Sequence, residues 1–134
     1  MFQTNFKQKK VLRKNKSFSE DTRQLFYYCY ECSVCGMNNW DALHHILGGN
    51  FEESDSPLNA CPIHNDKCHV GSGHQFSKHQ ENLMLSKTLV YLVKEKYKFT
   101  EKDKAFIKRF EERYLMIDES RQIVMSLKNN KTIL

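Results

Sequence analysis

Apolar residues in the second half of the chain recur at the spacing of helices. One series at positions i, i+4, i+7 and i+8 predicts a helix over 79–97, with a buried face made of Leu85, Leu89, Leu92 and Val93. A second helix is predicted to begin after Thr100, which has the spacing of a capping box with Asp103. Its buried stripe repeats every four residues and comprises Phe106, Phe110 and Tyr114. A shorter helix is expected over 118–127.

The central part of the chain has shorter apolar segments, interrupted by glycines and polar residues. The run over 40–47 predicts a strand that ends at Gly48 and Gly49. Residues 50–57 have the polar composition of a loop, and the short run over 58–61 is either a second strand or its turn. An aromatic segment over 24–35 leads into a Cys-x-x-Cys-Gly turn, whereas residues 1–18 lack periodicity. Together these elements predict an α+β fold.

The composition is that of one small globular domain. The chain has 134 residues, 40% of them hydrophobic and 28% charged, and no run approaches the roughly 18 consecutive apolar residues of a membrane helix. The first residues lack the apolar segment of a secretory signal. Five cysteines, an odd number, argue against a secreted disulfide framework and favour a reducing compartment. A cytoplasmic protein is therefore expected.

Charge is distributed unevenly along the chain. Residues 1–23 hold seven Lys or Arg and two acidic residues (net +5), residues 24–76 hold one and six (net −5), and residues 77–134 hold thirteen and eight (net +5). Basic ends can neutralise phosphates, and an acidic centre suits a bound cation. The N-terminal candidates for phosphate contacts are Lys7, Lys9, Lys10, Arg13, Lys14 and Lys16. A solvated lysine-rich surface is the alternative explanation.

Residues of the types that bind metals gather between positions 29 and 79, which include all five cysteines and all six histidines. A Cys-x-x-Cys turn lets two thiolates reach one tetrahedral ion, and a second, more widely spaced pair follows after 25 intervening residues. The predicted ligands of a structural zinc ion are thus Cys32, Cys35, Cys61 and Cys68. Cys29 and His64 are substitutes if one of the four is not a ligand. Reduced core cysteines are the alternative for the whole set.

Two adjacent histidines end the predicted strand. Neighbouring strand residues point to opposite faces, so the two imidazoles are not expected to lie in the core together. The order of Cys32-x-x-Cys35, His44-His45, Asn59 and Cys68-His69 resembles that of the HNH endonuclease family over about residues 30–75. The main departure is the gap of six residues between Cys61 and Cys68, where zinc-bearing members usually have two.

The resemblance implies a ββα-metal core, in which a hairpin and a helix surround one catalytic divalent ion, with separate structural zinc knuckles. By position, it implies that His45 is the general base and that Asn59 orients His45 by cross-linking the loop. It assigns His44 and His69 as ligands of the catalytic ion, with His74 as a candidate third ligand.

The same resemblance implies that the chain forms one domain with three segments. Residues 1–23 would form a basic arm, residues 24–78 the zinc-stabilised HNH core, and residues 79–134 a helical extension packed on that core. His79 is expected on the surface of the first long helix.

The activity that the resemblance implies is hydrolysis of phosphodiester bonds in double-stranded or branched DNA. Mg²⁺, Mn²⁺ or a similar ion would stabilise the phosphorane and the leaving group, while His45 activates water. The basic ends would hold the duplex through its phosphates. A non-catalytic zinc module that binds DNA or RNA explains the cysteines and the charge, but not the histidines and Asn59. A protein-interaction domain explains only the lysine-rich ends.

Overall fold

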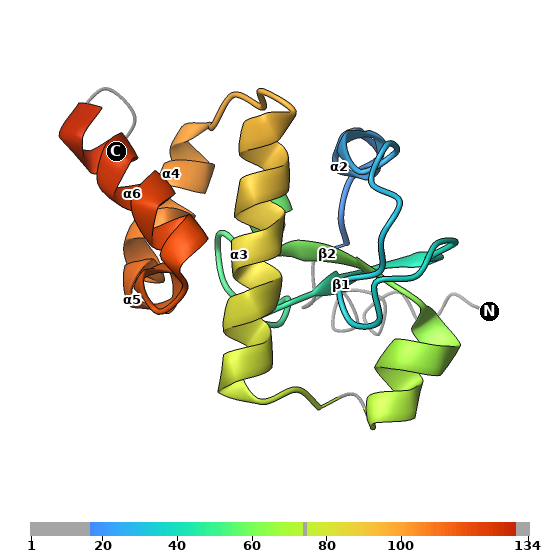
Figure 1. Cartoon of the computed structure of the whole chain (residues 1–134). Helices are drawn as coiled ribbons and strands as arrows, with labels where there is room; N and C mark the ends of the chain where they lie inside the picture. Colours follow the sequence, from blue (N-terminus) through green and yellow to red (C-terminus); the bar gives the residue numbers. More distant parts are fainter. Residues whose placement is uncertain (1–16, 74, 131–134) are drawn as a thin grey trace, which may run out of the picture.

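The computed structural model describes residues 17–73 and 75–130 (Figure 1). A small sheet lies on one side of a long helix, and the C-terminal helices pack on the other side. The helices are α2 (Glu20–Leu25), α3 (Lys78–Lys94), α4 (Glu101–Arg109), α5 (Glu111–Leu115) and α6 (Asp118–Asn130). The predicted α+β class is confirmed. His74 lies outside the described residues, and so do the N-terminal basic residues predicted to contact phosphate.

The sheet has two strands, β1 (Ala42–His45) and β2 (Ala60–Ile63), which pair antiparallel with His44 opposite Cys61. The strand predicted within 40–47 is confirmed. The run over 58–61 contains both of the elements considered for it. Residues Pro57–Asn59 form a 3₁₀ turn, and β2 follows directly.

Helix α3 packs against the sheet with the face that the sequence predicts. Leu85, Leu89 and Leu92 are fully buried, whereas Val93 is 39% exposed and lies at the edge of that face. The hydroxyl of Thr88 donates a 2.6 Å hydrogen bond to the β2 carbonyl of Ala60. A capping box formed by residues 77 and 80 starts the helix, and a left-handed residue at position 96 follows its end.

The second predicted helix starts as expected but is shorter than its apolar stripe. Thr100 and Asp103 form the predicted capping box at the start of α4. At Phe110 the backbone leaves the helical region (φ −114°, ψ 25°), so α4 ends and α5 begins after it. The break gives Phe110 a partly buried position against Phe106, at 4.9 Å between ring centroids, while Tyr114 is fully buried. The helix predicted over 118–127 is confirmed as α6.

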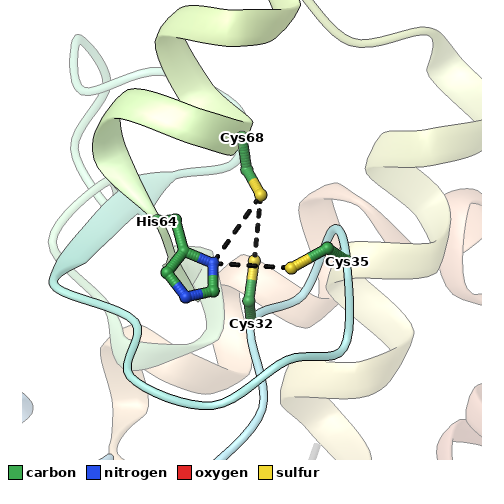
Figure 2. Close-up of side chains that lie close together, drawn as sticks. All are labelled: Cys32, Cys35, His64 and Cys68. Carbon is green, nitrogen blue, oxygen red and sulfur yellow. Dashed lines mark hydrogen bonds between the residues drawn. The ribbon is translucent and has the colours of Figure 1, made fainter.

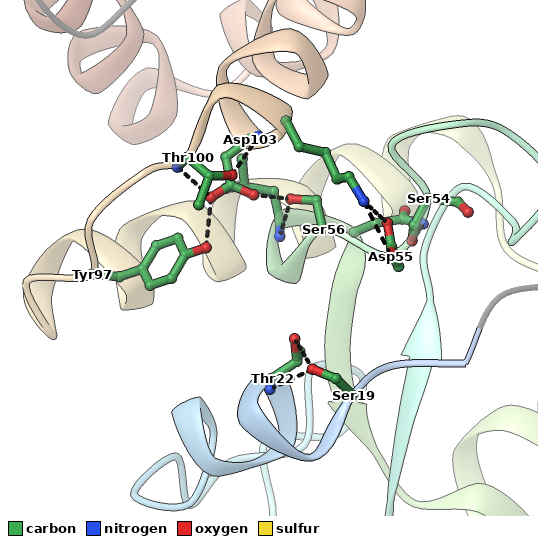
Figure 3. A network of polar contacts seen from close by, with 11 residues as sticks. Ser19, Thr22, Ser54, Asp55, Ser56, Tyr97, Thr100 and Asp103 are labelled. Atoms are coloured by element: carbon green, nitrogen blue, oxygen red, sulfur yellow. Dashed lines mark hydrogen bonds and ion pairs between the residues drawn. The ribbon is translucent and has the colours of Figure 1, made fainter.

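A buried carboxylate ties the segment before β2 to the start of α4 (Figure 3). Asp103 is 1% exposed and accepts hydrogen bonds from the Ser56 hydroxyl (2.7 Å), the Tyr97 hydroxyl (2.5 Å) and the Thr100 backbone N–H (2.8 Å). Such bonds compensate the cost of burying a charge. The network fixes the entry into β2 relative to the C-terminal helices.

The sheet and the C-terminal helices share one hydrophobic core. Its fully buried side chains come from both parts and include Leu58, Cys61, Leu85, Leu89, Leu92, Phe106, Ile107, Tyr114 and Val124. The short helix α2, which the sequence did not predict, begins at a cap formed by Ser19 and is followed by the buried ring of Phe26. In the described part of the chain, no helix combines the length and apolar character of a membrane span.

Candidate functional site

Four side chains converge at one side of the sheet. Cys32, Cys35, His64 and Cys68 point toward one another (Figure 2), and their ligand atoms all lie within 4.8 Å of one another. The Sγ atoms of Cys32 and Cys68 are 3.6 Å apart, and Nδ1 of His64 is 3.4 Å from Sγ of Cys35. A zinc ion held tetrahedrally at about 2.3 Å from each sulfur would place the sulfurs about 3.8 Å apart. The cluster therefore has the dimensions of a zinc site.

Two separate segments supply these ligands. Cys32 and Cys35 lie on a turn closed by a 2.9 Å bond from the Gly36 N–H to the Cys32 carbonyl, with Gly36 at a φ of 76° that favours glycine. His64 directly follows β2, and Cys68 lies on the short helix over Asn65–His69. A metal here would therefore join the loop before β1 to the segment after β2.

The imidazole of His64 is held in a ligand-ready orientation. Its Nε2 lies 2.7 Å from the carbonyl of Asn38, so Nε2 carries the proton and donates it to that carbonyl. This bond raises the pKa of His64, with a smaller opposing effect of burial. It leaves the Nδ1 lone pair facing the thiols, which is the usual way that a second partner orients a metal-binding histidine.

The surroundings favour a thiolate within the cluster. Burial opposes ionisation of Cys32, but the backbone N–H groups of Cys35 and Val34 lower its pKa to about 6. Burial and the neighbouring thiols of Cys32 and Cys35 raise the pKa of Cys68 to about 11. A bound divalent ion would deprotonate coordinating thiols outright. Three sulfurs and one imidazole form a soft donor set that suits zinc.

The structure corrects the predicted zinc ligands at one position. Cys61 lies on β2, is fully buried in the main core and is absent from the cluster, and burial raises its pKa to about 12. His64, considered as a substitute, takes the fourth position. Cys29, the other substitute, is half-buried beside the main core, and burial raises its pKa. The second ligand pair is thus His-x-x-x-Cys.

A second group of histidines lies close to this cluster in sequence. His44 on β1 and His69 at the end of the short helix have ring centroids 4.5 Å apart, and Phe76 lies 5.4 Å from His44. The two residues predicted to share a catalytic ion are therefore neighbours. Within the described residues, only the Cys/His cluster brings three or more metal-binding side chains together. The histidine pair therefore offers two protein ligands to an ion.

His45 ends β1 beside this pair. Its ring stacks on Phe18, with centroids 4.0 Å apart and planes inclined by 15°. His44, His45 and His69 all line a hollow of about 330 Å³, to which Gly48 and Asn65 also contribute. The structure thus brings the predicted base and both predicted ligands to one concave surface.

Asn59 is fully buried and cross-links the loop between the strands. Its amide nitrogen donates 2.9 Å hydrogen bonds to the carbonyls of Gly48 and Ser54, and its oxygen accepts a 2.9 Å bond from the Leu47 N–H. The predicted cross-linking of this loop is confirmed. Because its two amide protons and its oxygen are all engaged, Asn59 holds the turn after His45 rather than facing a ligand.

Sequence reasoning missed the aromatic side chains of this site, Phe18 and Phe76, since no motif distinguishes them from core residues. The predicted exposure of His79 on α3 is confirmed. Comparisons of the chain with protein-family models, curated proteins and solved structures gave no match.

Proposed function

We propose that this chain is a metal-dependent endonuclease of the HNH type that hydrolyses DNA phosphodiester bonds. The observation that carries the proposal is the pairing of His44 with His69, whose ring centroids are 4.5 Å apart, in a hollow that His45 also lines. A hairpin followed by a short helix frames this hollow, as expected of a ββα-metal core. A structural zinc site alone would require none of these three histidines.

The donor set of the hollow fits a divalent ion. The imidazoles of His44 and His69 would hold it, and their tilt of 54° keeps the rings from stacking face to face. Bound there, the ion would supply Lewis-acid stabilisation of the charge on the phosphate and the leaving oxygen. Imidazole ligands suit divalent transition-metal ions, whereas Mg²⁺ prefers oxygen ligands, so this pair fits a transition-metal ion better than Mg²⁺.

His45 would act as general base in this reaction. A neutral imidazole can take a proton from water near pH 7 because its unperturbed pKa is close to that pH. Stacking on Phe18 restricts its ring, and the hydrogen bonds of Asn59 fix the turn behind it. Such restraint would hold the imidazole in one orientation, and the orientation of a catalytic group contributes strongly to rate.

The zinc cluster has a structural role in this proposal. Cys68 directly precedes His69, so a zinc ion on Cys68 would also fix the backbone that carries one ligand of the catalytic ion. A small domain gains much of its folding free energy from such a site. The two metal sites would then be distinct in chemistry but coupled through adjacent residues.

The alternative function is that of a non-catalytic zinc module that binds nucleic acid. The zinc-type cluster and the formal net charge of +5 favour this module as much as they favour a nuclease. It differs from the nuclease in one outcome, because such a module would bind DNA and leave it intact in every divalent ion.

The test is a plasmid assay on the zinc-loaded protein. Supercoiled DNA is incubated with Mg²⁺, Mn²⁺ or EDTA, alongside a His44→Ala variant purified in the same way. We expect nicked or linear DNA from the wild type in at least one divalent ion, none in EDTA, and much less from the variant. Binding without cleavage in every ion would support the zinc module instead. Equal cleavage by both preparations would reveal a contaminating nuclease and count against the proposal.

A further inference from the structure

A second hollow, of about 470 Å³, adjoins the histidine site and has a wall made by the C-terminal helices. His44, His45 and Gly48 line it from the sheet side, whereas Glu81, Phe110 and Arg113 line it from α3, α4's end and α5. Its volume lies in the range typical of ligand sites. The HNH resemblance ends before these helices, and the sequence singles out none of their residues as a phosphate contact.

Arg113 is held rigidly in this wall. Its Nε donates a 2.7 Å hydrogen bond to Oδ1 of Asn82, which is 3% exposed, and its Nη2 donates a 2.7 Å bond to Oε1 of Glu81. The Arg113 side chain is 20% exposed. Both bonds use the same edge of the guanidinium group, and among the described residues no partner is assigned to Nη1. The orientation of the cation is therefore fixed before any ligand binds.

Glu81 lines the hollow beside Arg113 and balances its charge, so the match to a phosphate comes from the open hydrogen-bond donors of Arg113. Among the described residues that line it, Arg113 is the one with a permanent positive charge, and two histidines accompany it. A guanidinium group has five donors, so its bonds to Asn82 and Glu81 leave donors for phosphate oxygens. Fixing the group in advance reduces the entropy lost when it binds a ligand.

We propose that Arg113 binds a non-bridging oxygen of the DNA phosphate that occupies this hollow. The inference rests on the nuclease function proposed above and adds a substrate-binding residue supplied by the C-terminal helices. The break at Phe110 matters here, because α5 begins directly after it and brings Arg113 to Glu81 and Asn82 of α3. Arg113 is a binding residue in this proposal, while Asn82 and Glu81 position it.

A purely structural ion pair between α3 and α5 is the competing explanation, and Arg109 offers the matched control. Arg109 on α4 also forms an ion pair, with Nε 2.9 Å from Oε1 of Glu53 in the loop between the strands, but it does not line the hollow. Arg109→Gln therefore removes one positive charge and one ion pair without altering the hollow. Arg113→Lys retains the positive charge of Arg113 but lacks the planar guanidinium group that Asn82 and Glu81 hold in place.

The experiment compares zinc-loaded wild type, Arg113→Gln, Arg113→Lys and Arg109→Gln. Cleavage rates are measured at limiting and saturating DNA, thermal unfolding is followed in parallel, and duplex binding is titrated against salt without added divalent ion. We expect Arg113→Gln to lose about 10- to 100-fold in cleavage efficiency and Arg113→Lys to lose less. The slope of log affinity against log salt should fall by up to about 0.9 in Arg113→Gln and stay unchanged in Arg109→Gln.

Equal losses in Arg113→Gln and Arg109→Gln, or wild-type cleavage and binding in Arg113→Gln, would overturn the inference. These results leave the proposed nuclease function standing, because the wild type still cleaves. If the wild type binds DNA without cleaving it, the nuclease proposal fails while the salt titration still decides about Arg113. An unchanged slope in Arg113→Gln then overturns phosphate binding, and a reduced slope specific to Arg113 supports it.

Discussion

The side-chain oxygen of Asn59 accepts a 2.9 Å hydrogen bond from the backbone N–H of Leu47, two residues after His45. The two amide protons of Asn59 complete the cross-link at the carbonyls of Gly48 and Ser54. A single buried amide thus satisfies three backbone groups of the loop that joins the strands. Because His45 is the last residue of β1, this loop determines how the proposed base is presented.

Asn59→Ala is expected to lower the free energy of unfolding by about 3 kcal/mol, because it leaves buried backbone groups without partners. Urea unfolding of the zinc-loaded protein measures the change. Asn50→Ala, at an exposed position of the same loop, is the control and should unfold like the wild type. A stability of Asn59→Ala equal to that of the control would contradict the role given to this amide.

Zinc binding should distinguish His64 from Cys61. We expect His64→Ala and Cys68→Ser to lose zinc and stability together, since a site that lacks one ligand contributes less folding free energy. Cys61→Ala should keep its zinc, because Cys61 lies in the main core and outside the cluster. Zinc per chain, measured after gel filtration, gives the answer. Loss of zinc from Cys61→Ala at unchanged zinc in His64→Ala would restore the four-cysteine site.

The dependence of cleavage on divalent-ion concentration should distinguish variants of the two proposed ligands from a variant of a surface histidine. His44→Ala and His69→Ala are expected to require a higher concentration of divalent ion for cleavage, with partial recovery at excess ion, because each removes one of two imidazoles. His79→Ala, exposed on α3, should show the wild-type dependence. Titration of the cleavage rate with Mn²⁺ measures this. Identical curves for all three variants would remove His44 and His69 from the metal site.

Alkaline pH should destabilise the fold in part through Tyr91. Burial, with a contribution from Glu95, raises the pKa of Tyr91 from 10.0 to about 12, and its hydroxyl donates a 2.8 Å bond to the Leu25 carbonyl. Between these pH values the folded state keeps a proton that the unfolded state releases, so stability falls as pH rises. Unfolding free energies of wild type and Tyr91→Phe at several pH values should show a shallower decline in the variant. Parallel curves would exclude this contribution.

Local signals in the sequence predicted most of the elements. The capping box of Thr100 and Asp103 and the stripe of Leu85, Leu89 and Leu92 are short-range features, and both are present in the structure. The break at Phe110 was not predictable, because the four-residue spacing of the aromatic stripe is equally compatible with one continuous helix. Packing of Phe110 against Phe106 and Phe51 outweighs that continuity.

The candidate site was predictable in part for the same reason. The order of the motif singled out His44, His45, Asn59 and His69, and the hairpin brings them to one region. The assumption of two cysteine pairs favoured Cys61 over His64 despite the wide spacing of the second pair. Pairing of β2 instead carries Cys61 into the core and leaves His64 just beyond the strand. Arg113 had no local signal, since only the packing of α5 against α3 brings it to the histidines.

The most direct test of the account is the single-turnover cleavage rate of His45→Ala against the wild type. Both proteins are prepared in parallel, with equal zinc content and equal DNA affinity, measured without added divalent ion, verified beforehand. We predict a loss of about 10²- to 10⁴-fold, because proton transfer from the attacking water loses its base while the metal-binding residues remain. Cleavage by His45→Ala at the wild-type rate would contradict the assignment of His45 and favour the non-catalytic zinc module.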